Sequence, residues 1–151
     1  EAKVSLFPGT AVADNGKMGN PEWVGDFNFG WTKGAWTLFY GLDVTGAASN
    51  MADLLRAQGG DACRTSSFRP GGRFCPDVSV PATFYHSLSV SRDVAERFRI
   101  TLGVANLFDT PPPRVSTVVT ATPPVIGQAP AFGTQYDYLG RRFFLSVRGK
   151  M

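Results

Sequence analysis

Hydrophobic and polar residues alternate along the last part of the chain, from Tyr136 to Lys150. In an extended segment, successive side chains point to opposite faces. One face then carries mostly apolar side chains: Leu139, Arg141, Phe143, Leu145 and Val147. The other is mostly polar: Gly140, Arg142, Phe144, Ser146, Arg148 and Lys150. A protein core on the polar side would bury unpaired cations, so the pattern favours a strand with lipid on one side and water on the other.

Earlier segments show the same two-residue period and predict two antiparallel hairpins. Residues 23–32 and 35–46 form the first pair, joined by a tight turn at Lys33-Gly34. Residues 82–92 and 97–108 form the second pair, which turns between Asp93 and Arg97. A fifth strand is expected over about 137–150.

The segments between these strands lack a regular period and predict long loops. One runs from Ala47 to Pro81 and holds both cysteines; within it, only Ala52 to Gln58 has the pattern of a short helix. The other runs from Asp109 to about Gln135, where proline pairs are expected to exclude regular strand pairing. Residues 1–22 are expected to form an external loop or the end of a preceding strand.

This arrangement of short turns and long loops is typical of outer-membrane β-barrels, which have short periplasmic turns and long external loops. No apolar stretch reaches the roughly 18 to 20 residues that a membrane-spanning helix requires, so membrane residence is expected through strands. The first residues, Glu1 to Phe7, do not have the pattern of a signal peptide. An exported protein would then carry its leader upstream.

Composition and charge add few constraints. A chain of 151 residues with 43% hydrophobic residues is compatible with one ordinary domain. The net charge of +3 would suit an anionic partner, but the basic residues are scattered rather than clustered. We therefore expect no binding of nucleic acid.

Two spaced motifs resemble the C-terminal end of TonB-dependent outer-membrane receptors. The first is the run Asn106, Leu107, Phe108 and Asp109, at the end of the expected penultimate strand. The second is Gly140, Arg141, Arg142 and Phe143, at the start of the closing strand. The segment Asn20 to Trp23 is also similar to members of this family.

The resemblance implies a fold and an activity. The whole receptor would be an antiparallel barrel of about 22 strands with a plugged lumen, of which this chain supplies the last five or so. Its function would be TonB-energised uptake of a scarce nutrient across the outer membrane of a Gram-negative bacterium. A ferric siderophore is the family default, and a carbohydrate, cobalamin or a peptide remains open.

The partners implied by the resemblance lie partly outside this sequence. We expect the plug domain and the TonB-contacting segment elsewhere, so that the chain is a fragment or one piece of a larger barrel. Five strands alone would leave two sheet edges, and the unpaired backbone N–H and C=O groups of these edges cannot form hydrogen bonds with lipid. The expected partners are the rest of the receptor, TonB, outer-membrane lipid and lipopolysaccharide, and a small-molecule nutrient.

Cys63 and Cys75 are expected to form a disulfide, because they share one Gly-rich loop of an exported protein. Two thiols and one distant histidine do not make a structural zinc site, and we expect no metal or cofactor. The only histidine, His86, falls on the lipid side of its strand. We therefore expect no catalytic residues and no enzyme activity.

The loop between the hairpins is the expected place of ligand contact, since binding residues concentrate on loops held by a rigid scaffold. Its basic and aromatic side chains would suit an anionic iron chelate or a lipopolysaccharide phosphate, although an ordinary solvated loop explains them equally well. These residues are Arg56, Arg64, Phe68, Arg69, Arg73 and Phe74. The carboxylates of Asp26, Asp43 and Asp137 would line the lumen or simply make its wall polar.

Two rival architectures remain open at this point. The chain would be a small, self-contained barrel of about eight strands with a structural or adhesive role if the Pro-rich loops paired. Alternatively, it would be a soluble, secreted β-sandwich that acts as a binding module.

Overall fold

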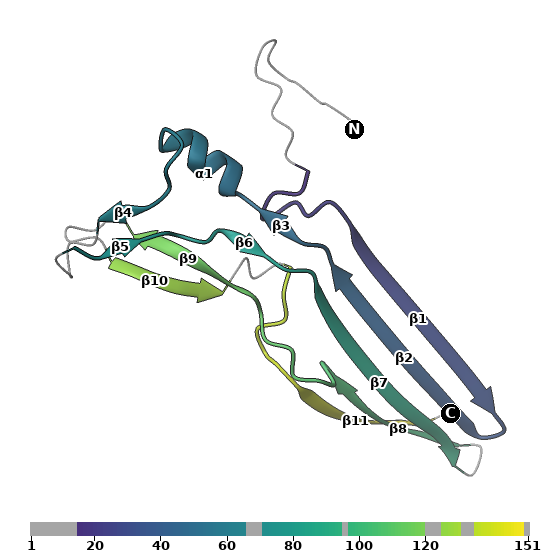
Figure 1. Ribbon diagram of the computed structural model, residues 1–151. Coiled ribbons are helices and arrows are strands. Elements are labelled where there is room, and N and C mark those ends of the chain that lie inside the picture. The colour runs from purple at the N-terminus through teal and green to yellow at the C-terminus, as the bar shows by residue number, and fades with distance from the viewer. Residues whose placement is uncertain (1–14, 66–70, 95–96, 120–124, 131–134, 150–151) are drawn as a thin grey trace.

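The largest element of the molecule is a five-stranded antiparallel sheet with the strand order β1-β2-β7-β8-β11 (Figure 1). A computed structural model describes residues 15–65, 71–94, 97–119, 125–130 and 135–149. The strands of the sheet are β1 (Val24–Lys33), β2 (Trp36–Thr45), β7 (Thr83–Val94), β8 (Phe98–Ala105) and β11 (Arg142–Gly149). The prediction of an all-β fold is confirmed.

Two strand boundaries differ from those expected. β8 ends at Ala105 rather than near residue 108, because Asn106 adopts a positive φ of 53° that an extended strand cannot continue. β11 begins at Arg142 rather than near residue 137. The backbone N–H of Leu139 donates to the Asp137 carboxylate at 2.9 Å, and Gly140 then takes a φ of 69°. This Asx-type turn delays the strand.

The first expected loop, from Ala47 to Pro81, contains more regular structure than predicted. The short helix lies at α1 (Met51–Ala57), close to its predicted position. Two small antiparallel ladders accompany it: β3 (Ala48–Ser49) with β6 (Ser79–Val80), and β4 (Arg64–Thr65) with β5 (Arg73–Phe74). Each ladder strand has only two residues, which is too short for a period to be visible in the sequence.

The expectation that prolines exclude pairing between Asp109 and Gln135 is wrong. β9 (Arg114–Val119) pairs with β10 (Val125–Pro130) in a separate two-stranded sheet. Pro113 precedes β9 and Pro130 is the last residue of β10, so these prolines flank the ladder and do not interrupt it. Within the described part of the chain, this hairpin is a sheet of its own and does not extend the five-stranded sheet, although the Ser116 N–H donates to the Asp77 carbonyl at 2.8 Å.

The strand register places the apolar positions of all five strands on one face. A single cross-strand row, for example, joins Trp31, Leu38, Val90, Leu102 and Leu145. We call this the apolar face of the sheet. Its large side chains are exposed: Leu102 is 61% exposed and Phe143 is 79% exposed.

The opposite face carries hydroxyl and charged side chains, and we call it the polar face. A neighbouring row joins Thr32, Thr37, Ser91, Thr101 and Ser146. Within this row the hydroxyls of Ser91 and Thr101 are hydrogen-bonded at 2.8 Å. The two faces therefore differ in chemistry along the whole width of the sheet.

Aromatic residues also occur on the polar face, where they cover glycines. Phe144 lies across Gly103 on the neighbouring strand, and a Cβ atom added at Gly103 would overlap the Phe144 ring. The ring thus occupies the space that the glycine leaves free. Aromatic side chains that cover a cross-strand glycine are a known way of holding strand register.

The buried core of the described residues is small and lies at the loop end of the sheet. It consists of Ala48, Val80, Tyr85, Val115 and Tyr136, with Met18 packed against it. Every residue of β1 and of β11 is exposed. Most of the sheet is therefore a single layer (Figure 1). No helix within the described part of the chain is long and apolar enough to cross a membrane.

Candidate functional site

The Asn106–Asp109 motif forms a closed turn at the end of β8. The Asn106 side chain is only 2% exposed and bonds Thr110 twice: its Nδ2 donates to the Thr110 carbonyl at 2.9 Å and its Oδ1 accepts from the Thr110 N–H at 2.8 Å. The Asp109 N–H donates to the Asn106 carbonyl at 3.0 Å. An asparagine is well suited here because it tolerates a positive φ and its amide is both donor and acceptor.

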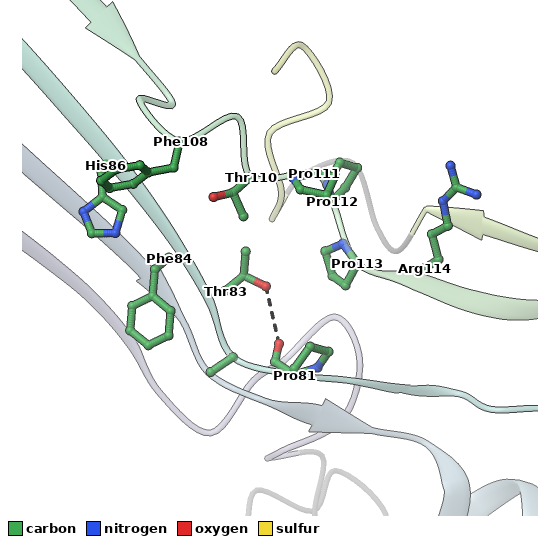
Figure 2. A pocket seen from close by; sticks show the side chains of 11 residues that line it. Pro81, Thr83, Phe84, His86, Phe108, Thr110, Pro111, Pro112, Pro113 and Arg114 are labelled. Carbon is green, nitrogen blue, oxygen red and sulfur yellow. Dashed lines mark hydrogen bonds between the residues drawn. The ribbon is translucent and has the colours of Figure 1, made fainter. Parts of the chain in front are cut away.

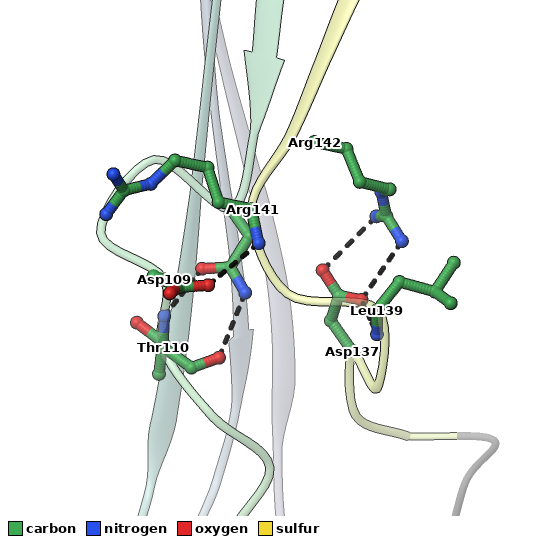
Figure 3. A network of polar contacts seen from close by, with 7 residues as sticks. Asp109, Thr110, Asp137, Leu139, Arg141 and Arg142 are labelled. Carbon is green, nitrogen blue, oxygen red and sulfur yellow. Dashed lines mark hydrogen bonds and ion pairs between the residues drawn. The ribbon is translucent and has the colours of Figure 1, made fainter.

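The same turn holds the second motif in place. Asp109 Oδ1 accepts a hydrogen bond from the backbone N–H of Arg141 at 2.8 Å (Figure 3). A Cβ atom at Gly140 would lie 2.9 Å from this oxygen, and Gly140 has a φ of 69°. Only glycine fits that position without displacing the carboxylate. The two motifs that resemble the receptor family thus meet in one polar junction, which we call the motif junction.

The junction continues into the closing strand. Arg142, the first residue of β11, forms a two-pronged ion pair with Asp137, at 3.1 and 3.2 Å. Such a bidentate pair has defined geometry as well as charge attraction. Asp137 therefore helps to fix the start of β11, and it is paired rather than freely solvated. Phe143, the next residue, belongs to the apolar face.

His86 connects the motif junction to β7 and β2. The backbone N–H of Leu107 donates to the His86 carbonyl at 2.7 Å, and the Phe108 ring meets the imidazole edge-on at 4.8 Å between centroids. The Tyr40 hydroxyl is hydrogen-bonded to His86 Nδ1 at 2.7 Å. His86 does lie on the apolar face, but its ring has a polar partner in Tyr40, which lowers the cost of placing an imidazole among apolar side chains.

An open groove lies beside this cluster at the start of β7, lined by residues of both faces of that strand. It has a volume of about 620 Å³ and runs between the start of β7 and the Pro-rich segment that leads to β9 (Figure 2). Its lining comprises Pro81, Ala82, Thr83, Phe84, His86, Phe108, Thr110, Pro111, Pro112, Pro113 and Arg114. Most of these side chains are apolar, and Arg114 is the one cation among them.

The disulfide between Cys63 and Cys75 is present, as expected. The two residues lie 12 positions apart, and the bond clamps the base of the β4–β5 ladder. It lies in the segment that carries the expected ligand-contacting side chains. Because a disulfide reduces the conformational entropy of the unfolded loop, it stabilises the β4–β5 ladder.

The basic residues of that loop are less available than their sequence pattern indicates. Arg73 is ion-paired with Asp61, and Arg56 lies 3.4 Å from Asp53. Lys17 Nζ lies 2.9 Å from Asp53 Oδ2, and this contact holds the pKa of Asp53 below its ordinary value. Two of the expected cations are therefore neutralised by neighbouring acids rather than gathered into an open anion site.

The remaining expected loop residues are only partly described. The backbone of Arg64 pairs with that of Phe74, which is half-buried. Phe68 and Arg69 lie outside the described residues. Arg56 lies in α1 and Arg73 and Phe74 lie in β5, so all three belong to the connection between β2 and β7, and none of the described contacts joins α1 with β5.

The polar face has its own distribution of charge. Asp26 and Asp43 lie opposite each other on β1 and β2, and the Asn28 amide donates to Asp26. At the other side of the sheet, Arg99 forms a bidentate pair with Asp93 at 2.7 and 2.8 Å, and Arg148 lies opposite Arg99. Two acidic residues therefore face each other near β1, whereas the arginines near β11 include Arg99, which is paired with Asp93.

Sequence reasoning missed the groove and the Tyr40–His86 bond. The sequence did contain a signal for this bond. Tyr40 and His86 both fall at positions that alternate onto the apolar face, and their strands β2 and β7 are neighbours in the sheet. Within the part of the chain that is described, no group of three or more His, Cys, Asp or Glu side chains is placed to hold a metal ion.

Comparison with models of known protein families gave no match, and searches of curated proteins and of solved structures gave none either.

Proposed function

We propose that this chain forms part of the wall of an outer-membrane β-barrel receptor in a Gram-negative bacterium. The observation that supports this most strongly is the single-layered sheet, with an exposed apolar face on one side and a polar face on the other. Water on both sides would leave a large apolar surface exposed, which monomeric soluble proteins rarely tolerate. In a barrel wall, lipid would cover the apolar face and water in the lumen would solvate the polar face.

The dimensions of the sheet support a membrane location. β1 has 10 residues. At about 3.3 Å per residue and a tilt of about 40°, a strand of that length covers about 25 Å, which matches the apolar band of outer-membrane barrels. Trp31, Trp36 and Phe98 lie near the short-turn end of the apolar face, where an aromatic girdle is expected. Arg92 stacks over the Trp36 ring at 5.0 Å, which offsets part of the cost of a cation beside lipid.

The connections between strands are asymmetric, as in these barrels. Both tight turns lie at one end of the sheet, whereas the helix and the three small ladders lie beyond the other end (Figure 1). We therefore assign the tight turns to the periplasmic side and the long connections to the outside.

The direction of the edge strands argues against closure by copies of this chain. All four strand pairings are antiparallel, so the outermost strands β1 and β11 run in the same direction. In a ring of copies, β11 of one copy would have to pair in parallel with β1 of the next. An all-antiparallel barrel instead requires an odd number of further strands, from another part of the receptor.

Within this barrel, the motif junction supports the TonB-dependent receptor class. The two segments that resemble that family meet through the Asp109–Arg141 hydrogen bond. On this basis the whole receptor imports a scarce nutrient with energy from TonB. A ferric siderophore is the first expectation for the cargo, and a carbohydrate, cobalamin or a peptide is the alternative.

Cell fractionation tests the location. The chain is expected in the outer-membrane pellet, where carbonate washing does not release it and detergent does. Release into the soluble fraction without detergent would instead support the secreted β-sandwich.

A transport assay tests the activity separately. Deleting the gene is expected to abolish TonB-dependent uptake of one nutrient class, measured with radiolabelled ferric chelates and then with the other cargo classes. Unchanged uptake of every class would reject the transport role while leaving the membrane location intact.

A further inference from the structure

Both long connections of the chain meet over one residue of the polar face. Tyr85 lies opposite Asp43 in the strand register and so belongs to the polar face, yet it is only 7% exposed. It shares the small core with two residues from each connection, which we call the roof: Ala48 and Val80 before β7, and Val115 and Tyr136 after β8. The connections therefore fold over the polar side of the sheet and do not only extend beyond its end.

Two hydrogen bonds join the connections to each other beside the roof, and we call this pair the latch. The Ser116 N–H donates to the Asp77 carbonyl at 2.8 Å, and the Asp77 N–H donates to Ser116 Oγ at 2.9 Å. The Asp77 carboxylate also accepts from the Ser79 N–H at 3.0 Å, which fixes the backbone at the start of β6. The latch thus ties the start of β9 to the segment that leads into β6.

The Tyr85 hydroxyl is an unfavourable group in this closed arrangement. It is buried, and no hydrogen bond joins it to the nearby Asp137 backbone or to any other group of the described residues. A buried hydroxyl without a partner destabilises the arrangement that buries it, because its hydrogen bonds to water have been lost. When the roof lifts, water reaches the hydroxyl and this cost disappears. The roof is therefore held less firmly than its apolar contacts alone would hold it.

We propose that the roof is a lid at the outer end of the lumen, which the latch holds closed and the buried Tyr85 hydroxyl biases towards opening. This inference rests on the proposed function, because the polar face borders a lumen only in a barrel wall. Opening would expose the start of β7 on the lumen side, where Ser87 is the next polar-face residue. Removing the hydroxyl should therefore favour the closed lid, whereas weakening the latch should favour the open one.

Hydrogen exchange at the backbone amide of residue 116, measured by mass spectrometry on the whole receptor in lipid, tests the lid. This amide belongs to the latch, so its exchange reports opening. Tyr85→Phe removes the unpartnered hydroxyl and is expected to slow the exchange about tenfold. Ser116→Ala removes one hydrogen bond of the latch and is expected to speed it about fivefold.

Tyr40→Phe is the matched control, because it removes the same hydroxyl from a tyrosine of the apolar face that does have a partner. It is expected to leave the exchange at residue 116 unchanged. Unchanged or faster exchange in Tyr85→Phe would overturn the proposal, since the hydroxyl would then not oppose closure. Unchanged exchange in Ser116→Ala would overturn it as well, since the latch would then hold nothing.

Labelling from outside the cell tests whether the lid covers the lumen. Ser87→Cys places a thiol on the polar face, while Cys63 and Cys75 are joined to each other. A membrane-impermeant maleimide is expected to label this thiol more slowly in the Tyr85→Phe background and faster in the Ser116→Ala background. The receptor without the Ser87→Cys change gives the blank. Equal rates in all backgrounds would reject the lid.

Failure of this inference is distinguishable from failure of the proposed function. A nitroxide label at Leu102 reports lipid contact independently of the roof. If that label contacts lipid while Tyr85→Phe does not slow the exchange, only the lid is rejected. If the label is in water, the membrane location itself is rejected.

Discussion

Individual residues at the motif junction show how the two family-like segments meet. Asp109 and Gly140 are far apart in sequence, yet one carboxylate oxygen bonds the backbone next to the glycine. Sequence reasoning identified both motifs but not this contact, because a long-range hydrogen bond leaves no local period. Its only trace in the sequence is a glycine where a positive φ is required.

The first prediction concerns Gly140→Ala. The new Cβ would meet Asp109 Oδ1 at 2.9 Å and impose a left-handed backbone on alanine. We expect a loss of about 1 to 3 kcal/mol in the free energy of unfolding, measured by urea titration in detergent micelles. Gly25→Ala is the control, because Gly25 has open space around its Cβ position. Equal effects of both substitutions would contradict the role of the junction.

The second prediction concerns Tyr40→Phe. His86 Nδ1 would lose its partner on the apolar face, and we expect a loss of about 1 to 2 kcal/mol in the same titration. In a His86→Phe background the Tyr40→Phe change is expected to be neutral or stabilising, since both polar groups are then gone. An equal cost in both backgrounds would show that the Tyr40–His86 bond contributes nothing.

At the level of elements, the alternation of side chains predicted the five long strands but not the short ladders. The period of two is strong over strands such as β2 and β7, because one face must be apolar along their whole length. β9 and β10 were missed because the prolines near them were interpreted as barriers, although Pro113 and Pro130 lie only at the ends of this hairpin.

The third prediction concerns the contact between β8 and β11. Gly103→Ala would place a methyl group in the space filled by the Phe144 ring. We expect a cost of about 1 to 3 kcal/mol in the free energy of unfolding. Combining it with Phe144→Leu should recover part of this loss, because the ring is then absent. A double variant as unstable as the sum of the single variants would rule out the direct contact.

The fourth prediction concerns the loop clamped by Cys63 and Cys75. Replacing both cysteines with serine removes a constraint worth about 2 to 3 kcal/mol for a loop of this size. Trypsin is therefore expected to cleave within the loop faster, while the circular dichroism of the sheet stays unchanged. Loss of the sheet signal as well would mean that the loop and the sheet fold as one unit.

For the whole molecule, the sequence predicted the class of structure and the separation of the two faces. It did not predict that Asp26 and Asp43 face each other near one edge of the polar face, with Arg99 and Arg148 near the other. This arrangement arises from strand order, which brings distant segments side by side. Strand order depends on which edges pair, and that is a property of the assembled sheet rather than of any single strand.

The central claim is that the apolar face contacts hydrocarbon. It is tested most directly by nitroxide labels at Leu102 and Leu145 on the apolar face and at Ser89 and Ser146 on the polar face, in the whole receptor that contains this chain, reconstituted in lipid. The account predicts that oxygen relaxes the two leucine-site labels strongly and that a water-soluble nickel chelate does not, with the reverse at the serine sites. Strong relaxation of the leucine-site labels by the nickel chelate would contradict it.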